Sequence, residues 1–175
     1  MEPSASLMSS ASSPLGDALA AYLTIHDALA SDTIEGVTEA ARAFDAAFAL
    51  AIQNAPADNP HVWHMRAGET SGVQQHAQSL AAATDIESAR SAFGQLSAPF
   101  AMLIEAAGAP DGFDLVRHTC GMQPELPEDG VWLQRVGEVR NPYFGGAMQM
   151  CSLERSSARR TSSRVEPSAD PTHGA

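Results

Sequence analysis

The feature that most constrains the fold is a helical spacing of apolar residues that runs, with short breaks, from residue 15 to residue 107. Apolar residues make up 44% of the 175-residue chain, but aromatic residues only 6%, and alanine supplies much of the difference. Alanine is the strongest helix former and favours closely packed helices. The pattern therefore predicts a mainly α fold, an up-and-down bundle of about four helices.

Signals at the ends of these segments set the predicted boundaries. Asp32 and Glu35 have the spacing of a capping box, which predicts that Asp32 begins the second helix. Pro99 lies inside the fourth helix and predicts a kink there. The four predicted helices cover residues 15–30, 32–55, 61–83 and 84–107.

After Gly112 the apolar spacing changes to a strand-like alternation over residues 113–118. A second strand candidate, Val131–Leu133, follows a turn-rich segment, so a small C-terminal β-hairpin is predicted. Residues 1–14 and 155–175 are rich in small polar residues and are predicted to be disordered. Residues 15–154 are thus expected to form one domain.

Charge and composition exclude several classes of function. The net charge of −11 should repel nucleic acid and acidic membrane surfaces. The chain has no lysine, which excludes Schiff-base chemistry and a phosphate-loop lysine. No segment approaches the roughly 18 apolar residues of a membrane span. The N-terminus has no basic start followed by an apolar run, so no signal peptide is predicted.

The sulfur-bearing residues gather in two short arms near the C-terminus. One arm reads Cys120-x-Met122 and the other Met148-x-x-Cys151. Thiolates and thioethers are soft donors that select Cu(I), whereas structural zinc sites use Cys and His. Gly121 allows the first arm to bend, and one helical turn would bring the second pair onto one face. The arms predict a three- or four-coordinate site for Cu(I) or Ag(I).

Two other interpretations of the same residues remain open. Cys120 and Cys151 could form a disulfide, which in the chain-entropy model would stabilise a loop of this length by roughly 3–4 kcal/mol. Alternatively, the thiols could be inert and buried, with Met122 and Met148 filling gaps in the core.

Histidines provide secondary ligand candidates. His118 lies two residues before Cys120 on the same strand face, and His76 lies on the third predicted helix. His61, His64 and Met65 have helical spacing suited to Cu(II), Ni(II) or Zn(II). Cys120 and His118 could be imagined as nucleophile and base, but nothing supplies an oxyanion hole or an orienting carboxylate. The chain is therefore not expected to be an enzyme.

Several motifs together resemble a known family. Cys120-Gly121-Met122, Trp132 and the run from Arg140 to Cys151 form one part of the resemblance. The upstream part lies in residues 22–32 and around His76, Asp85, Arg90 and Phe93. In these residues the chain is similar to a small bacterial helical domain of unknown function. That domain occurs alone in envelope proteins or appended to adaptor subunits of copper/silver efflux pumps. Its end motif contains Asn141, Pro142, Tyr143, Phe144 and Gly145.

The resemblance implies a role in copper handling or efflux in the periplasm or cell envelope. The implied partners are a metal ion and an efflux adaptor or other envelope protein. A metal-free module, locked by a Cys120–Cys151 disulfide and docking on such a protein, is the alternative. The chain departs from the family at three positions: glycine replaces proline at 121, serine replaces glycine at 152, and alanine replaces histidine at 92.

Overall fold

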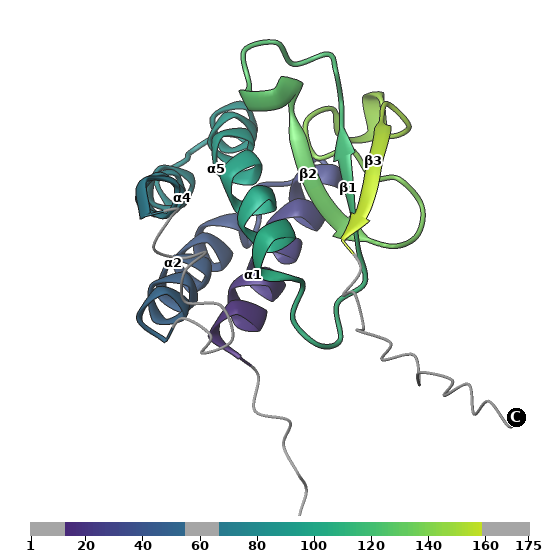
Figure 1. Ribbon diagram of the computed structural model, residues 1–175. Helices are drawn as coiled ribbons and strands as arrows, with labels where there is room; N and C mark the ends of the chain where they lie inside the picture. The colour runs from purple at the N-terminus through teal and green to yellow at the C-terminus, as the bar shows by residue number, and fades with distance from the viewer. Residues whose placement is uncertain (1–12, 55–66, 159–175) are drawn as a thin grey trace, which may run out of the picture.

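The computed structural model describes residues 13–54 and 67–158, which form four helices and a three-stranded sheet (Figure 1). The helices and strands are α1 (Pro14–Ala30), α2 (Val37–Gln53), α4 (Ala67–Ala81), α5 (Ile86–Ala107), β1 (Leu115–Thr119), β2 (Val131–Arg135) and β3 (Leu153–Ala158). Two short 3-10 turns, η1 (Pro127–Asp129) and η2 (Gly145–Ala147), lie in the loops.

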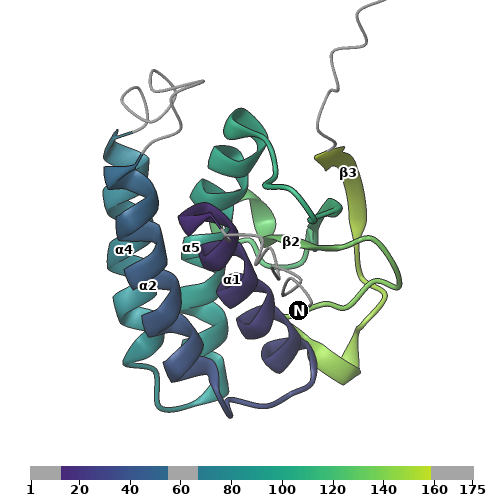
Figure 2. The same cartoon turned by 90° about the horizontal axis from the view of Figure 1, so that it is seen from below.

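The elements stack in three layers. Figures 1 and 2 show α2 and α4 side by side as an outer layer, α1 and α5 in the middle, and the sheet on the other side. This arrangement confirms the mainly α fold, with four helices and an antiparallel hairpin near the C-terminus. None of the helices in the described ranges is long and apolar enough to cross a membrane.

The few aromatic residues form the centre of the core. The ring of Tyr22 on α1 lies 5.0 Å from Phe93 and 5.1 Å from Phe100, both on α5. Phe44 on α2 packs edge-on against Phe100. Burial raises the pKa of Tyr22, so its hydroxyl stays protonated. It bonds Ser97 Oγ at 2.8 Å and accepts the N–H of Leu133 in β2 at 3.0 Å, which joins the helices to the sheet.

The predicted start of the second helix was wrong. α2 begins at Val37 after the N-cap Gly36, and Asp32 instead binds residues far along the chain. α5 begins next to Asp85, whose side chain accepts the N–H of Ser88 at 2.8 Å. It continues through Pro99 to Ala107. The predicted helix over residues 61–83 corresponds to α4, and its first part, residues 61–66, lies outside the described residues.

The sheet has the order β2-β1-β3, with antiparallel pairing on both sides of β1. The hairpin of β1 and β2 pairs His118 with Trp132. The sequence pattern did not indicate β3, because its segment lacks an alternation of apolar and polar residues. This strand is defined by backbone pairing with β1, and it carries the chain to Ala158, into the segment predicted to be a tail.

The loop between β1 and β2 is docked onto α5. A Cβ atom at Gly94 in α5 would lie 2.6 Å from Leu126 Cδ1, so the glycine lets the buried Leu126 side chain pack directly on the helix. On the sheet side, Arg117 of β1 forms ion pairs with Glu105 of α5 and with Glu128 of the loop. These contacts hold the loop that begins at Cys120.

Candidate functional site

Two thiols that are far apart in the sequence meet at one end of the sheet. Cys120 directly follows β1, and Cys151 lies two residues before β3. The pairing of Thr119 with Leu153 brings these ends together. The two Sγ atoms lie 3.3 Å apart, 31 positions apart in the chain, and both cysteines are free. Cys120 is buried and Cys151 is half-buried, so the pair is reached from the side of Cys151.

Hydrogen bonds hold the two cysteines in place. Asn141 Nδ2 donates to Cys120 Sγ at 3.4 Å and to the Cys151 carbonyl at 2.9 Å. Cys151 Sγ donates to the Cys120 carbonyl at 3.3 Å. The hydrogen bond with Cys120, and then burial, raises the pKa of the Cys151 thiol. Cys151 therefore keeps its proton to a higher pH than an ordinary cysteine.

Asn141 also shapes the bend formed by residues 141–146. Its Oδ1 accepts the backbone N–H of Tyr143 at 2.8 Å and that of Phe144 at 3.1 Å, and its carbonyl accepts the N–H of Gly145 at 3.0 Å. Asparagine favours turns of this kind because its side chain can bond backbone groups two residues on. The Tyr143 hydroxyl donates to the Val131 carbonyl, and its ring packs edge-on against Trp132. The motif is thus a turn held against β2.

Arg90 of α5 binds this bend to the helices. Its Nε donates to the Pro142 carbonyl at 2.8 Å, and its Nη2 donates to Leu29 O at 2.8 Å and Asp32 Oδ1 at 2.7 Å. The second oxygen of Asp32 accepts the N–H of Gly146 at 2.8 Å. One guanidinium and one carboxylate thereby connect α1, α5 and the bend.

Arg140, the residue before the bend, is bound to α1. Buried His26 donates from Nε2 to the Arg140 carbonyl at 2.8 Å. Arg140 in turn donates to Asp27 Oδ1 at 3.2 Å and to Ser31 Oγ at 2.6 Å. The hydrogen bond with His26 is the largest of the effects that lower the pKa of Asp27. The loop carrying Asn141 is therefore fixed to the helical body on both sides.

The Asp32 contacts predict a loss of stability in acid. The hydrogen bond from Arg90, followed by that from Gly146, lowers the pKa of Asp32. The pKa of Asp32 in the folded protein therefore lies below its unfolded value of about 3.9. The contribution of the ionised Asp32 side chain to stability is complete above the unfolded pKa, and it is lost as the pH falls through the folded pKa. Asp32→Asn should be less stable than the wild type at neutral pH and lose less on acidification. Urea unfolding at neutral and acid pH measures this, with Glu35→Gln as the control for removing a surface carboxylate outside the network. If Asp32→Asn and the wild type lost equal stability on acidification, the acid sensitivity would not come from Asp32.

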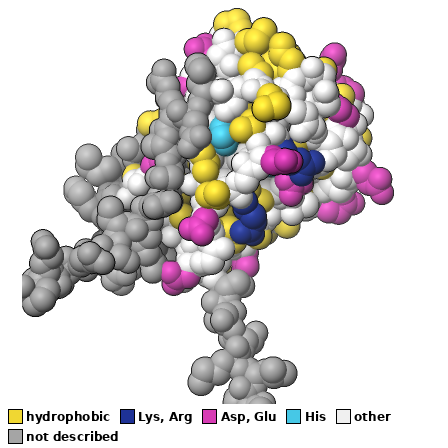
Figure 3. Space-filling view, turned by 90° about the vertical axis from the view of Figure 1, so that its right-hand side faces the viewer, with side chains coloured by type: hydrophobic (Ala, Val, Ile, Leu, Met, Phe, Trp, Pro, Cys, Tyr) yellow, Lys and Arg dark blue, Asp and Glu magenta, His cyan; other side chains and the backbone are white. Residues whose placement is uncertain are grey.

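The methionines of the two arms lie at the surface. Met122 is 53% exposed, Met148 37% and Met150 87%. Figure 3 shows hydrophobic side chains gathered at the upper end of the face that is turned to the viewer. A single turn joins Met148 to Cys151, in which the Cys151 N–H donates to the Met148 carbonyl at 3.2 Å; this turn is separate from η2, which ends at Ala147. Exposed methionines within three residues of a cysteine in the sequence offer soft donors that solvent can reach.

Two of the predicted histidine candidates, His118 and His76, lie in the part of the chain that the structure describes. His118 Nδ1 bonds Ser152 Oγ at 2.6 Å, and its ring stacks on Trp132 with centroids 5.2 Å apart. His76 lies on α4, in the outer helical layer away from the sheet (Figure 1). In the described ranges, no three His, Cys, Asp or Glu side chains are grouped so that they could hold a metal. His61, His64 and Met65 lie outside the described residues.

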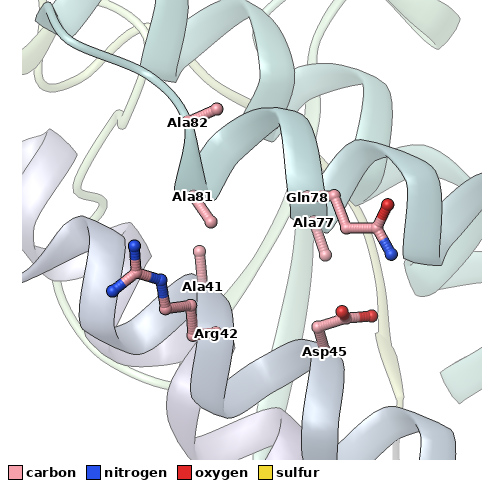
Figure 4. Close-up of a pocket in the computed structure, with 7 residues that line it drawn as sticks. All are labelled: Ala41, Arg42, Asp45, Ala77, Gln78, Ala81 and Ala82. Atoms are coloured by element: carbon pink, nitrogen blue, oxygen red, sulfur yellow. The ribbon is translucent and has the colours of Figure 1, made fainter.

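A separate hollow of about 330 Å³ lies between α2 and α4 (Figure 4). Asp45 and Gln78 face the same space, and within the described structure the buried Oδ1 of Asp45 has no hydrogen-bond partner. The remaining lining is Ala41, Arg42, Ala77, Ala81 and Ala82. The hollow contains no soft donor and lies in the outer helical layer, so it is distinct from the thiol pair.

The sequence did not indicate that His26, Asp32 and Arg90 anchor the bend. Their partners lie 52 to 114 positions away in the chain, and no local pattern marks such pairs. The one available signal was that Asp32 and Arg90 belong to the motifs of the resemblance.

A family model described as a protein of unknown function (DUF3347) matches residues 18–112, over half of the chain. No curated protein and no solved structure matches. The matched part ends before β1, so the sheet and both cysteines lie beyond it. Asp32 and Arg90, which hold the bend, lie within it.

Proposed function

The chain belongs to the DUF3347 family of unknown function, and we propose that it binds a soft monovalent metal ion, Cu(I) or Ag(I), through Cys120 and Cys151. The 3.3 Å separation of the two free thiols carries the proposal. With metal–thiolate bonds of about 2.3 Å, two sulfurs on a tetrahedral ion lie about 3.8 Å apart. The pair needs to open by only about 0.5 Å to hold such an ion.

Met122 and Met148 are the proposed additional ligands. Each belongs to the same arm as one cysteine, and both are exposed, so their flexible side chains can turn toward a bound ion. A thioether is a poor ligand for zinc but suits Cu(I). The thiols lose protons when they bind metal, so the affinity falls in acid. The exposure of the methionines suits an ion that is passed on by ligand exchange.

A second candidate function rests on the same distance. Two free thiols at 3.3 Å are close to forming a disulfide, whose bond length is about 2.0 Å. A locked domain of this kind would act as a metal-free interaction module. In both cases we propose, from the resemblance to domains of copper/silver efflux systems, that the protein acts in the periplasm or cell envelope. An efflux adaptor or another envelope protein is the proposed partner.

Competition with a chromophoric Cu(I) chelator under reducing conditions tests the first proposal. The reduced protein should retain one Cu(I) per chain, and the protein oxidised to the disulfide should retain none. Met122→Leu and Met148→Leu should each weaken binding, whereas Met150→Leu should not, because Met150 belongs to neither ligand pair. Reduced protein that retains no copper would overturn the proposal, and thiols that resist alkylation until reductant is added would favour the locked module.

A further inference from the structure

We propose that Asn141 is the positioning residue of the dithiol: its buried carboxamide holds the Cys120 sulfur and the Cys151 backbone in one arrangement. The consequence for metal binding rests on the proposed function. The effect on the geometry of the two thiols does not, because it concerns the metal-free protein.

The carboxamide of Asn141 uses its whole hydrogen-bonding capacity. Its two N–H groups reach Cys120 Sγ at 3.4 Å and the Cys151 carbonyl at 2.9 Å. Its oxygen accepts the N–H groups of Tyr143 and Phe144. The side chain is fully buried, so any rotation would leave several buried polar groups without partners. The amide is therefore held in one orientation.

Asn141 is also anchored independently of the two arms that it joins. The preceding residue, Arg140, is bound to α1 through His26 and Asp27. The carbonyl of the following residue, Pro142, is bound by Arg90 of α5. The helical body therefore sets the position of the amide, and the amide sets the relation between Cys120 and the Cys151 backbone. This explains how helices that carry no sulfur ligand of their own can control the sulfur pair.

Aspartate at position 141 separates the two roles of the side chain: its oxygen holds the bend, and its N–H groups join the two arms. Asn141→Asp keeps the shape and the acceptor oxygen that holds the bend, but it replaces the N–H donors with a second oxygen that faces a sulfur and a carbonyl. Asn141→Ser is a second test, because a serine hydroxyl can accept a nearby backbone N–H but is too short to join both arms. Val73→Ala is the matched control, since it removes buried apolar volume from α4 and touches neither arm.

Two measurements on the full chain test the inference. The first is the midpoint potential of the Cys120–Cys151 couple in defined dithiothreitol buffers without metal. The second is Cu(I) affinity by chelator competition. Loss of a residue that supports metal ligands typically costs 10–100-fold in affinity, so both Asn141 variants should lose about that much. The dithiol–disulfide equilibrium should shift at least tenfold, which is about 30 mV. Val73→Ala should change neither quantity, although it lowers the melting temperature.

The outcomes separate this inference from the proposed function. If the wild type binds Cu(I) and the Asn141 variants keep both affinity and potential within threefold, the positioning role is wrong and the metal function stands. If the wild type binds no Cu(I) but the variants shift the potential, the positioning role stands and the metal function is wrong. If Val73→Ala shifts the potential as much as they do, the effect is general destabilisation and the inference is overturned. Should Asn141→Asp fail to fold by circular dichroism, Asn141→Ser decides by the same criteria.

Discussion

Cys120→Ser should lower the affinity for Cu(I) by more than the roughly 100-fold that marks the upper range for supporting residues. The substitution removes a soft thiolate and leaves a hard hydroxyl in its place. The fold should persist, because serine is similar in size and its oxygen can still accept the N–H that Asn141 donates. Chelator competition measures the affinity, and circular dichroism checks that the helices are intact. Cys151→Ser should have a similar effect, since neither thiol alone can chelate.

The same variants distinguish the two candidate functions. If the cysteines act as a structural disulfide, either serine variant should lose roughly 3–4 kcal/mol of stability relative to the oxidised wild type. If they act as a metal-binding dithiol, the metal-free reduced wild type and the variants should differ little in stability but greatly in copper retention. A variant that matches the reduced wild type in copper affinity would remove the basis for metal binding.

Gly145→Ala should destabilise the protein by about 2–4 kcal/mol, because two costs coincide at this position. Gly145 has φ +53°, a left-handed conformation that alanine adopts at a cost. In addition, a Cβ atom there would overlap the Asp32 carboxylate and lie 2.7 Å from Arg90 Nη2. The added methyl group would separate Asp32 from Arg90 and release the bend from the helices. Urea unfolding measures the loss of stability.

Gly36→Ala is the matched control for the conformational cost alone. Gly36 also has a positive φ, +78°, but no atom lies within 4 Å of its Cβ position. It should lose only about 1 kcal/mol, the cost of placing alanine in a left-handed conformation. Gly145→Ala should in addition weaken Cu(I) binding, because the bend that positions Asn141 would move. Equal stability losses in the two variants would show that the close approach of Asp32 and Arg90 to Gly145 does not contribute to the loss.

The local features of the helices could be predicted because they depend on neighbouring residues. The spacing of Leu15, Leu19, Tyr22 and Leu29 marks one face of α1, and those side chains are buried in the structure. The predicted helix over residues 84–107 begins two residues before the observed start of α5 at Ile86 and ends with it at Ala107. The alternation after Gly112 likewise indicated β1. Each of these signals operates within a few residues along the chain.

The same reasoning failed where a residue had a distant partner. Asp32 has the sequence of a helix cap, but Arg90 and Gly146 offer it hydrogen bonds that a cap position would forgo. β3 has no pattern of its own, because a strand at the edge of a small sheet is defined by backbone pairing with β1.

By itself, the sequence determined the class of fold, the approximate ends of the helices and the two arms that carry sulfur. Only the tertiary structure decided that the two thiols lie 3.3 Å apart, that Asn141 joins their arms, and that Asp32 and Arg90 hold the bend in place. The physical reason is the range of the interactions. Helix propensity, capping and alternation act between neighbours along the chain. The thiol pair is instead assembled by hydrogen bonds that span 10 to 114 positions and exist only when the helices and the sheet have packed together.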